Sequence, residues 1–163
     1  MTRIPISLEV NGRELEVHVE PNQPLVEVLR AHAGATDVKV GCAEGVCGTC
    51  TVLLDGEPVS SCLVFAVQAD GAEVTTLRGL LGNDGSLHPL QRCFLEHGGS
   101  QCGFCTPGMV LTAQWFADRR PDASRDEIRE ALEGNLCRCT GYTKILDAVE
   151  AYLKEAQRVG SGA

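Results

Sequence analysis

The stretch GCAEGVCGTC, residues 41–50, is the most informative segment in the first half of the chain. It places Cys42, Cys47 and Cys50 with four and then two residues between them, and Cys62 follows after eleven more. The glycines among these cysteines let the backbone turn sharply and bring N–H groups close to the sulfur atoms. We therefore expect a loop that wraps a ligand with thiolates, and not a regular helix or strand.

The spacing of the first three cysteines indicates the ligand. Cys-x4-Cys-x2-Cys is the plant-type ferredoxin spacing for a [2Fe–2S] cluster, in which one loop supplies three thiolates and a later residue supplies the fourth. Zinc sites are usually built from Cys-x2-Cys pairs, and only Cys47 and Cys50 have that gap in this loop. The spacing favours a [2Fe–2S] cluster over zinc or buried free thiols.

Strand-like runs lie on both sides of this loop. Residues 4–10 and 14–19 are separated by Asn-Gly at 11–12, a pair that readily adopts the positive φ angles of a tight hairpin. Residues 51–54 and 58–59 surround an Asp-Gly pair and predict a second hairpin. The first half is thus predicted to hold two antiparallel strand pairs.

Between the two hairpins, Asn22 is the expected N-cap of a helix that Gly34 ends. Strands and a helix of this kind form an α+β unit, which we place at residues 1–76. The composition then changes to Gly, Asn, Asp and Ser, and later residues have helical periodicity. We predict a linker at residues 77–85 and a helical domain at residues 86–163.

The second half predicts four helices. The expected N-caps are Ser86, Thr106 followed by Pro107, and Ser124 with Glu127 in a capping box. Residues 145–153 carry the apolar stripe of the last helix. Such helices predict a compact four-helix bundle, followed by a frayed tail from Val159.

The second half also holds a second group of cysteines. Cys102 and Cys105 are separated by two residues, and Cys137 and Cys139 follow with one residue between them. A Cys-x2-Cys pair with a distant Cys-x-Cys pair could hold zinc, and a lone Cys-x2-Cys could be a redox pair. Because the expected helices bring both pairs to one end of the bundle, the spacing favours a second iron–sulfur cluster.

Three motifs carry a resemblance to a known family. GCAEGVCGTC with Cys62, QCGFCTPGM at 101–109 and GNLCRCTGY at 134–142 closely resemble the small iron–sulfur subunit of the molybdenum hydroxylases, the xanthine dehydrogenase, aldehyde oxidase and carbon monoxide dehydrogenase family. The resemblance covers nearly the whole chain. It implies a ferredoxin-like β-grasp domain with one [2Fe–2S] cluster, followed by a four-helix-bundle-like domain with a second.

The resemblance also implies the site residues. The ligands would be Cys42, Cys47, Cys50 and Cys62 for the first cluster, and Cys102, Cys105, Cys137 and Cys139 for the second. Gln101 and Cys139 match family positions beside the molybdopterin of a partner chain. The first cluster would face the flavin of another partner.

The implied function is electron transfer without an active site of this chain's own. Electrons would pass singly from molybdopterin on a large partner subunit, through both clusters, to FAD on a medium partner subunit. Such complexes are commonly dimers of heterotrimers. The alternative is a free two-cluster ferredoxin, which an acidic surface favours but which does not need the helical half. A zinc-stabilised interaction module leaves the first cysteine spacing unexplained.

Composition excludes other classes of function. The 163 residues include 14 Lys and Arg against 22 Asp and Glu, a formal net charge of −8, which argues against nucleic-acid binding. No apolar run approaches the roughly 18 residues of a transmembrane segment, and the N-terminus lacks a signal-peptide pattern. We therefore expect a cytoplasmic protein, in which the reducing compartment favours metal ligation by cysteine over disulfides.

Three further residues are assigned to the core. Cys93, the ninth cysteine, falls on the same helical face as Leu90, and Cys is often buried. For Trp115 and Phe116, packing in the helical core is favoured over a subunit interface.

Overall fold

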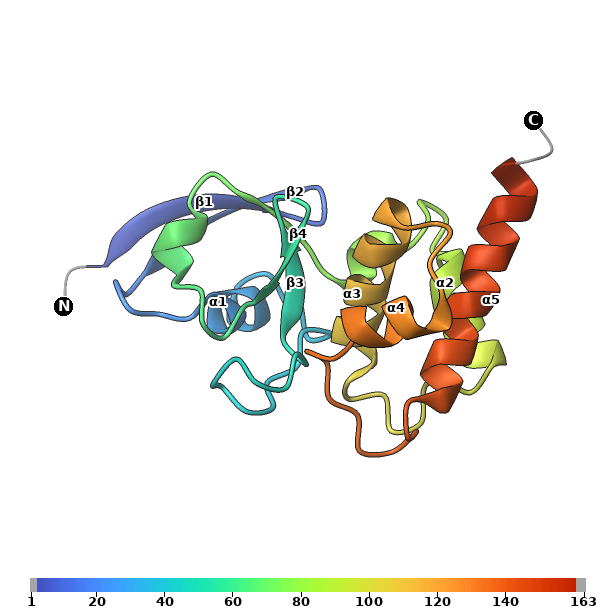
Figure 1. Cartoon of the computed structure of the whole chain (residues 1–163). Coiled ribbons are helices and arrows are strands. Elements are labelled where there is room, and N and C mark those ends of the chain that lie inside the picture. The colour runs from blue at the N-terminus through green and yellow to red at the C-terminus, as the bar shows by residue number, and fades with distance from the viewer. Residues whose placement is uncertain (1–2, 161–163) are drawn as a thin grey trace.

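The computed structural model describes residues 3–160. Its strands are β1 (Ile4–Val10), β2 (Arg13–Val19), β3 (Thr51–Leu54), β4 (Glu57–Ser60) and β5 (Glu73–Thr75). Its helices are α1 (Leu25–Ala31), α2 (Pro89–Glu96), α3 (Thr106–Arg119), α4 (Arg125–Ala131) and α5 (Thr143–Gly160), with single 3-10 turns η1 (Ala66–Ala69) and η2 (Leu77–Leu80). The strands and α1 lie at one end of the molecule and α2 to α5 at the other, so the fold is α+β (Figure 1).

The five strands form one mixed sheet in the order β2-β1-β5-β3-β4. Both predicted hairpins are confirmed, since β1 pairs antiparallel with β2 and β3 with β4. Asn11 and Gly12 form the first turn with φ angles of 52° and 77°. The central strand β5, parallel to β1, was not predicted because three residues are too few to show an alternating pattern.

The first helix begins later than the sequence indicates. Asn22 was the expected N-cap, but the cap position is Pro24, whose ψ of 142° is extended. Pro24 also forms an isolated β-bridge with Phe65, which holds the preceding backbone outside the helix. The buried side chains of α1 and of the sheet together form the first hydrophobic cluster.

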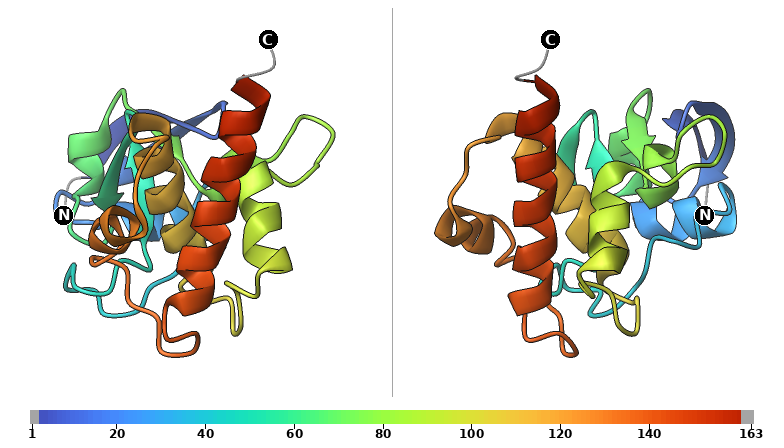
Figure 2. Two further views of the ribbon diagram at one scale, coloured as in Figure 1. Left: turned by 45° about the vertical axis from the view of Figure 1, so that its right-hand side comes forward. Right: turned by 90° about the vertical axis from the view of Figure 1, so that its right-hand side faces the viewer.

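Helices α2 to α5 lie together in one half of the molecule (Figure 2). Their buried side chains form a second hydrophobic cluster, which includes the fully buried Cys93. The capping box of Ser124 and Glu127 is confirmed. Ser86 is not a cap, because the α2 N-cap is His88, whose imidazole accepts a hydrogen bond from the Leu90 N–H at 3.3 Å.

Two other helix ends also differ from prediction. Cys105 occupies the α3 cap position, so Thr106 and Pro107 are its first two helical residues. The prediction of a frayed tail from Val159 is wrong for residues 159–160, because α5 continues to Gly160. Residues 161–163 lie outside the described residues. None of the helices within residues 3–160 is long and apolar enough to cross a membrane.

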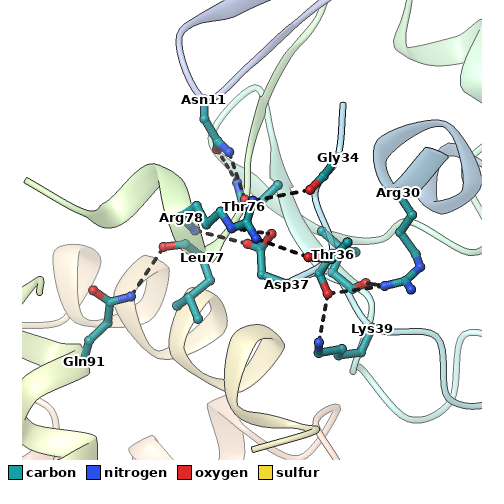
Figure 3. Close-up of polar contacts among 11 residues, drawn as sticks. Asn11, Arg30, Gly34, Thr36, Asp37, Lys39, Thr76, Leu77, Arg78 and Gln91 are labelled. Atoms are coloured by element: carbon teal, nitrogen blue, oxygen red, sulfur yellow. Dashed lines mark hydrogen bonds and ion pairs between the residues drawn. The ribbon is translucent and has the colours of Figure 1, made fainter. Parts of the chain in front are cut away.

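The segment after β5 is hydrogen-bonded to both halves of the chain (Figure 3). The Asn11 amide exchanges two hydrogen bonds with Thr76, at 2.8 and 2.9 Å. The Arg78 backbone N–H donates to the Asp37 carboxylate at 3.1 Å, and the Gln91 amide donates to the Leu77 carbonyl at 3.4 Å. Thr76 is thus fixed to the turn after β1, and the segment predicted as a linker, which begins at Leu77, is fixed to the region after α1 and to α2.

A second contact joins α3 to the β3–β4 hairpin. The Trp115 indole and the Arg119 guanidinium both donate to the Glu57 carboxylate, at 3.0 and 2.5 Å. Arg119 also lies over the Trp115 ring. Trp115 thus joins the two halves of the chain, whereas the sequence predicted packing in the helical core. Phe116 packs against the second cluster as predicted.

Candidate metal centre

Three cysteine-bearing loops lie along the same side of the molecule, at the bottom of all three ribbon views (Figures 1 and 2). The first is residues 41–50, which precede β3. The second is residues 98–105 before α3, and the third is residues 132–142 between α4 and α5. With Cys62, which follows β4, these loops carry every cysteine that the spacing assigned to a metal site.

The first cysteine set consists of Cys42, Cys47, Cys50 and Cys62, and backbone N–H donors surround the sulfur of Cys42. Its sulfur accepts hydrogen bonds from the N–H groups of Glu44, Val46 and Cys47, each at 3.4 Å. These bonds, led by that of Glu44, lower the pKa of Cys42 to about 6. Donors aimed at a sulfur favour the thiolate, which is the form that ligates iron.

Cys50 and Cys62 form the second pair of the first set. Cys50 is buried, and its side chain hydrogen-bonds that of Cys62. Burial, followed by this bond, raises the pKa of Cys62 to about 11. Because a bound cation deprotonates the thiol that coordinates it, metal binding here would release protons.

The second cysteine set, Cys102, Cys105, Cys137 and Cys139, is also arranged in pairs. The Cys139 thiol donates to the Cys102 sulfur at 3.5 Å, and both residues are exposed. Cys105 hydrogen-bonds Cys137, and burial together with that bond raises the pKa of Cys105 to about 12. One pair of this set therefore lies at the surface and the other lies deeper.

This pairing fits a two-iron cluster. Within residues 3–160, the structure gathers the cysteines in pairs, and no group of three or more Cys, His, Asp or Glu side chains is placed to hold a metal ion. In a [2Fe–2S] cluster the four thiolates are shared between two irons, so each iron takes a pair of cysteines. The donor chemistry and the pairwise arrangement of both sets are compatible with such a cluster.

Three residues beside the sulfurs were missed by the sequence analysis. The hydroxyls of Thr49 and Thr140 lie 3.2 Å from the sulfurs of Cys47 and Cys137, respectively. The Tyr142 hydroxyl accepts a hydrogen bond from the Cys137 backbone N–H at 2.9 Å. All three residues lie in or next to the quoted motifs, but the spacing of cysteines says nothing about which neighbours reach a sulfur.

Gln101 is exposed and lies next to Cys102, whose sulfur is paired with that of Cys139. Both residues predicted to lie beside molybdopterin are therefore at the accessible edge of the second set. Their contact with a partner's cofactor stays a prediction.

Two family models match the chain, and together they span both cysteine sets. The "2Fe-2S iron-sulfur cluster binding domain" matches residues 8–80, and the "[2Fe-2S] binding domain" matches residues 76–150. The first range contains Cys42 to Cys62, and the second contains Cys102 to Cys139.

Relatives of known activity match over almost their full length. The nicotinate dehydrogenase small FeS subunit of Eubacterium barkeri is 50% identical over 149 residues, which cover 91% of this chain and 94% of that protein. The nicotine 6-hydroxylase small subunit of Paenarthrobacter nicotinovorans is 46% identical, with 90% and 88% covered.

A solved structure matches equally well. A chain of quinoline 2-oxidoreductase from Pseudomonas putida 86 is similar with a TM-score of 0.91 and 46% identity, covering 98% of this chain and 99% of that one. The chain therefore belongs to the small iron–sulfur subunits of the molybdenum hydroxylase family.

Proposed function

We propose that this chain is the electron-transfer subunit of a multi-subunit molybdenum hydroxylase, between molybdopterin on one partner chain and FAD on another. When bound, each [2Fe–2S] cluster accepts and releases one electron at a time. The observation that carries the proposal is the presence of two separate four-cysteine sets in a chain that matches small subunits over nearly its full length.

We assign Cys42, Cys47, Cys50 and Cys62 to one cluster. The assignment is supported by the hydrogen bond between Cys50 and Cys62 and by the three backbone donors at Cys42. Hydrogen bonds to sulfur stabilise negative charge and so tune the reduction potential of a cluster. For a one-electron couple, about 59 mV corresponds to a tenfold change in equilibrium.

We assign Cys102, Cys105, Cys137 and Cys139 to the other cluster, on the strength of their two side-chain pairs. The sheet with α1 would be the ferredoxin-like β-grasp domain and helices α2 to α5 the bundle-like domain, divided at residues 77–85. The two separate hydrophobic clusters support that division.

The subunit's own residues would hold the clusters and dock them, and carry out no substrate chemistry. The exposed pair Cys102 and Cys139, with Gln101 beside it, would face molybdopterin on the large subunit. Near the first set, Val46 and Leu63 expose about 60% of their surface (61% and 58%), which suits contact with the FAD subunit. The assembly would be a dimer of heterotrimers.

We also place the complex in the cytoplasm. Free thiols persist in a reducing compartment, and this chain depends on eight of them as ligands. Separation of the cells into cytoplasmic, periplasmic and membrane fractions, followed by detection of the chain, tests this placement; recovery outside the cytoplasmic fraction would contradict it.

The variant Cys139→Ser tests the assignment of the second cluster. A serine hydroxyl replaces a thiolate ligand, so the electron paramagnetic resonance signal of this cluster should be lost or altered while the other signal persists. Cys93→Ala is the matched control, because Cys93 is fully buried in the helical core and belongs to neither set.

Both signals should survive in the control. If both signals also survived unchanged in Cys139→Ser, the assignment of that residue as a ligand would be wrong. If the unmodified complex gave no iron–sulfur signal after chemical reduction, the proposed function itself would fail.

A further inference from the structure

The cysteine loops at residues 41–50 and 132–142 are in direct contact through backbone atoms. The Leu136 N–H donates to the Cys47 carbonyl at 2.9 Å. Leu136 precedes Cys137, so one hydrogen bond separates a cysteine of the first set from the neighbour of a cysteine of the second. This contact therefore lies directly between the two sets.

One buried side chain lies at this contact. Asn135 is only 4% exposed, and its amide donates to the Gly48 carbonyl at 3.0 Å and lies 3.4 Å from the Thr51 hydroxyl. The Gly48 carbonyl also accepts the Thr51 hydroxyl at 2.7 Å. Asn135 thus connects the loop between α4 and α5 to the turn that carries Cys47 and Cys50.

Two glycines allow the loops to approach this closely. A Cβ on Gly108, in the first turn of α3, would lie 2.2 Å from the Gly48 carbonyl oxygen. A Cβ on Gly48 would lie 2.3 Å from the Gly134 carbonyl oxygen. In both cases the colliding atom is backbone, so no side chain can rotate to make room.

We infer that Asn135 is a positioning residue, which together with the glycine contact between Gly48 and Gly108 sets the separation of the two iron–sulfur clusters. The inference rests on the proposed function, because it assigns the clusters to the two cysteine sets. Asn135 itself is not expected to touch either cluster. It acts through the Gly48 carbonyl, between two ligand positions of the first set.

The test uses the complex purified from its native source, with substitutions introduced into this chain. Asn135→Asp has nearly the same shape but replaces the amide donor with a carboxylate oxygen, which faces the Gly48 carbonyl and repels it. Gly108→Ala introduces a methyl group against the same carbonyl, at a helical position where alanine is otherwise favourable. The two variants push the loops apart by different means.

The readout is the magnetic interaction between the two reduced clusters, measured as the splitting of their electron paramagnetic resonance signals. This dipolar splitting falls with the cube of the distance between the centres. We expect both variants to retain the iron of two clusters and to show smaller splitting than the unmodified complex. Glu57→Gln is the control, because it weakens a contact between the halves of the chain in which no residue of the cysteine loops takes part, and it should leave the splitting unchanged.

Unchanged splitting in both variants at full iron content would overturn the inference. Loss of iron from both variants would also overturn it, because Asn135 and Gly108 would then be needed to build the loops and not to space them. Absence of two interacting clusters in the unmodified complex would instead refute the proposed function.

Discussion

The close contact at Gly48 predicts a graded response to alanine substitution at three glycines. Gly12, Gly45 and Gly48 all have positive φ, at 77°, 75° and 66°. A methyl group would meet nothing within 4 Å at Gly12, the exposed Leu63 side chain at Gly45, and backbone oxygen at Gly48. The series therefore separates strain in the backbone from collision with a neighbour.

The magnitudes follow from these surroundings. Left-handed backbone costs a residue with a Cβ about 1–2 kcal/mol, which is the expected destabilisation for Gly12→Ala and, after Leu63 rotates away, for Gly45→Ala. Gly48→Ala adds an overpacking cost of about 1–3 kcal/mol, for a total of about 2–5 kcal/mol. Since about 1 kcal/mol shifts the melting temperature of a chain of this size by about 2–4 °C, the fall for Gly48→Ala should be about 4–20 °C.

The assay is thermal denaturation of the purified complex, followed by the visible absorption of its iron–sulfur clusters. The fall for Gly12→Ala and Gly45→Ala should be similar, at about 2–8 °C. A melting temperature for Gly48→Ala equal to that of Gly12→Ala would refute the argument that the two loops are in close backbone contact at this residue.

Four other substitutions probe the fold and its electrostatics. Phe94→Ala removes a side chain that is 1% exposed and should cost about 3–5 kcal/mol, measured by urea denaturation. Ser124→Ala removes the α4 cap and should cost about 0.5–2 kcal/mol in the same measurement. Glu57→Gln weakens a solvent-exposed ion pair, so it should lower the free energy of unfolding by less than about 1 kcal/mol. A larger loss would contradict the argument that this exposed pair contributes little. The Ser124 backbone N–H and hydroxyl, with Arg120, hold the pKa of Glu127 at about 2, below its usual 4.5, so its contribution to stability is complete above pH 4.5 and is lost as the pH falls towards 2. Between pH 6 and pH 4 the melting temperature should therefore fall less in Glu127→Gln than in the unmodified protein, and an equal fall would contradict this assignment.

Local signals predicted the hairpin turns and one helix cap correctly, but they misplaced the N-caps of α1, α2 and α3. The turn at Asn11 and Gly12 and the capping box of Ser124 and Glu127 were identified from adjacent residues alone. Cysteine spacing likewise predicted two metal sites, because ligand number and order are properties of the chain itself.

The features that sequence missed depend on contacts between distant residues. Strand β5 is held by pairing with β1 and β3, which its three residues do not encode locally. The bridge of Pro24 to Phe65 likewise moved the start of α1. Asn135 is 87 positions from Gly48, so nothing in either motif could identify their hydrogen bond.

The most direct test of the central claim is the iron, molybdenum and flavin content per copy of this chain, in protein purified from its native source without an affinity tag. Four irons with one molybdenum and one flavin are predicted by two [2Fe–2S] clusters within a hydroxylase complex. Four irons alone would contradict the assignment as a subunit and favour a free ferredoxin, and zinc in place of iron would contradict both clusters.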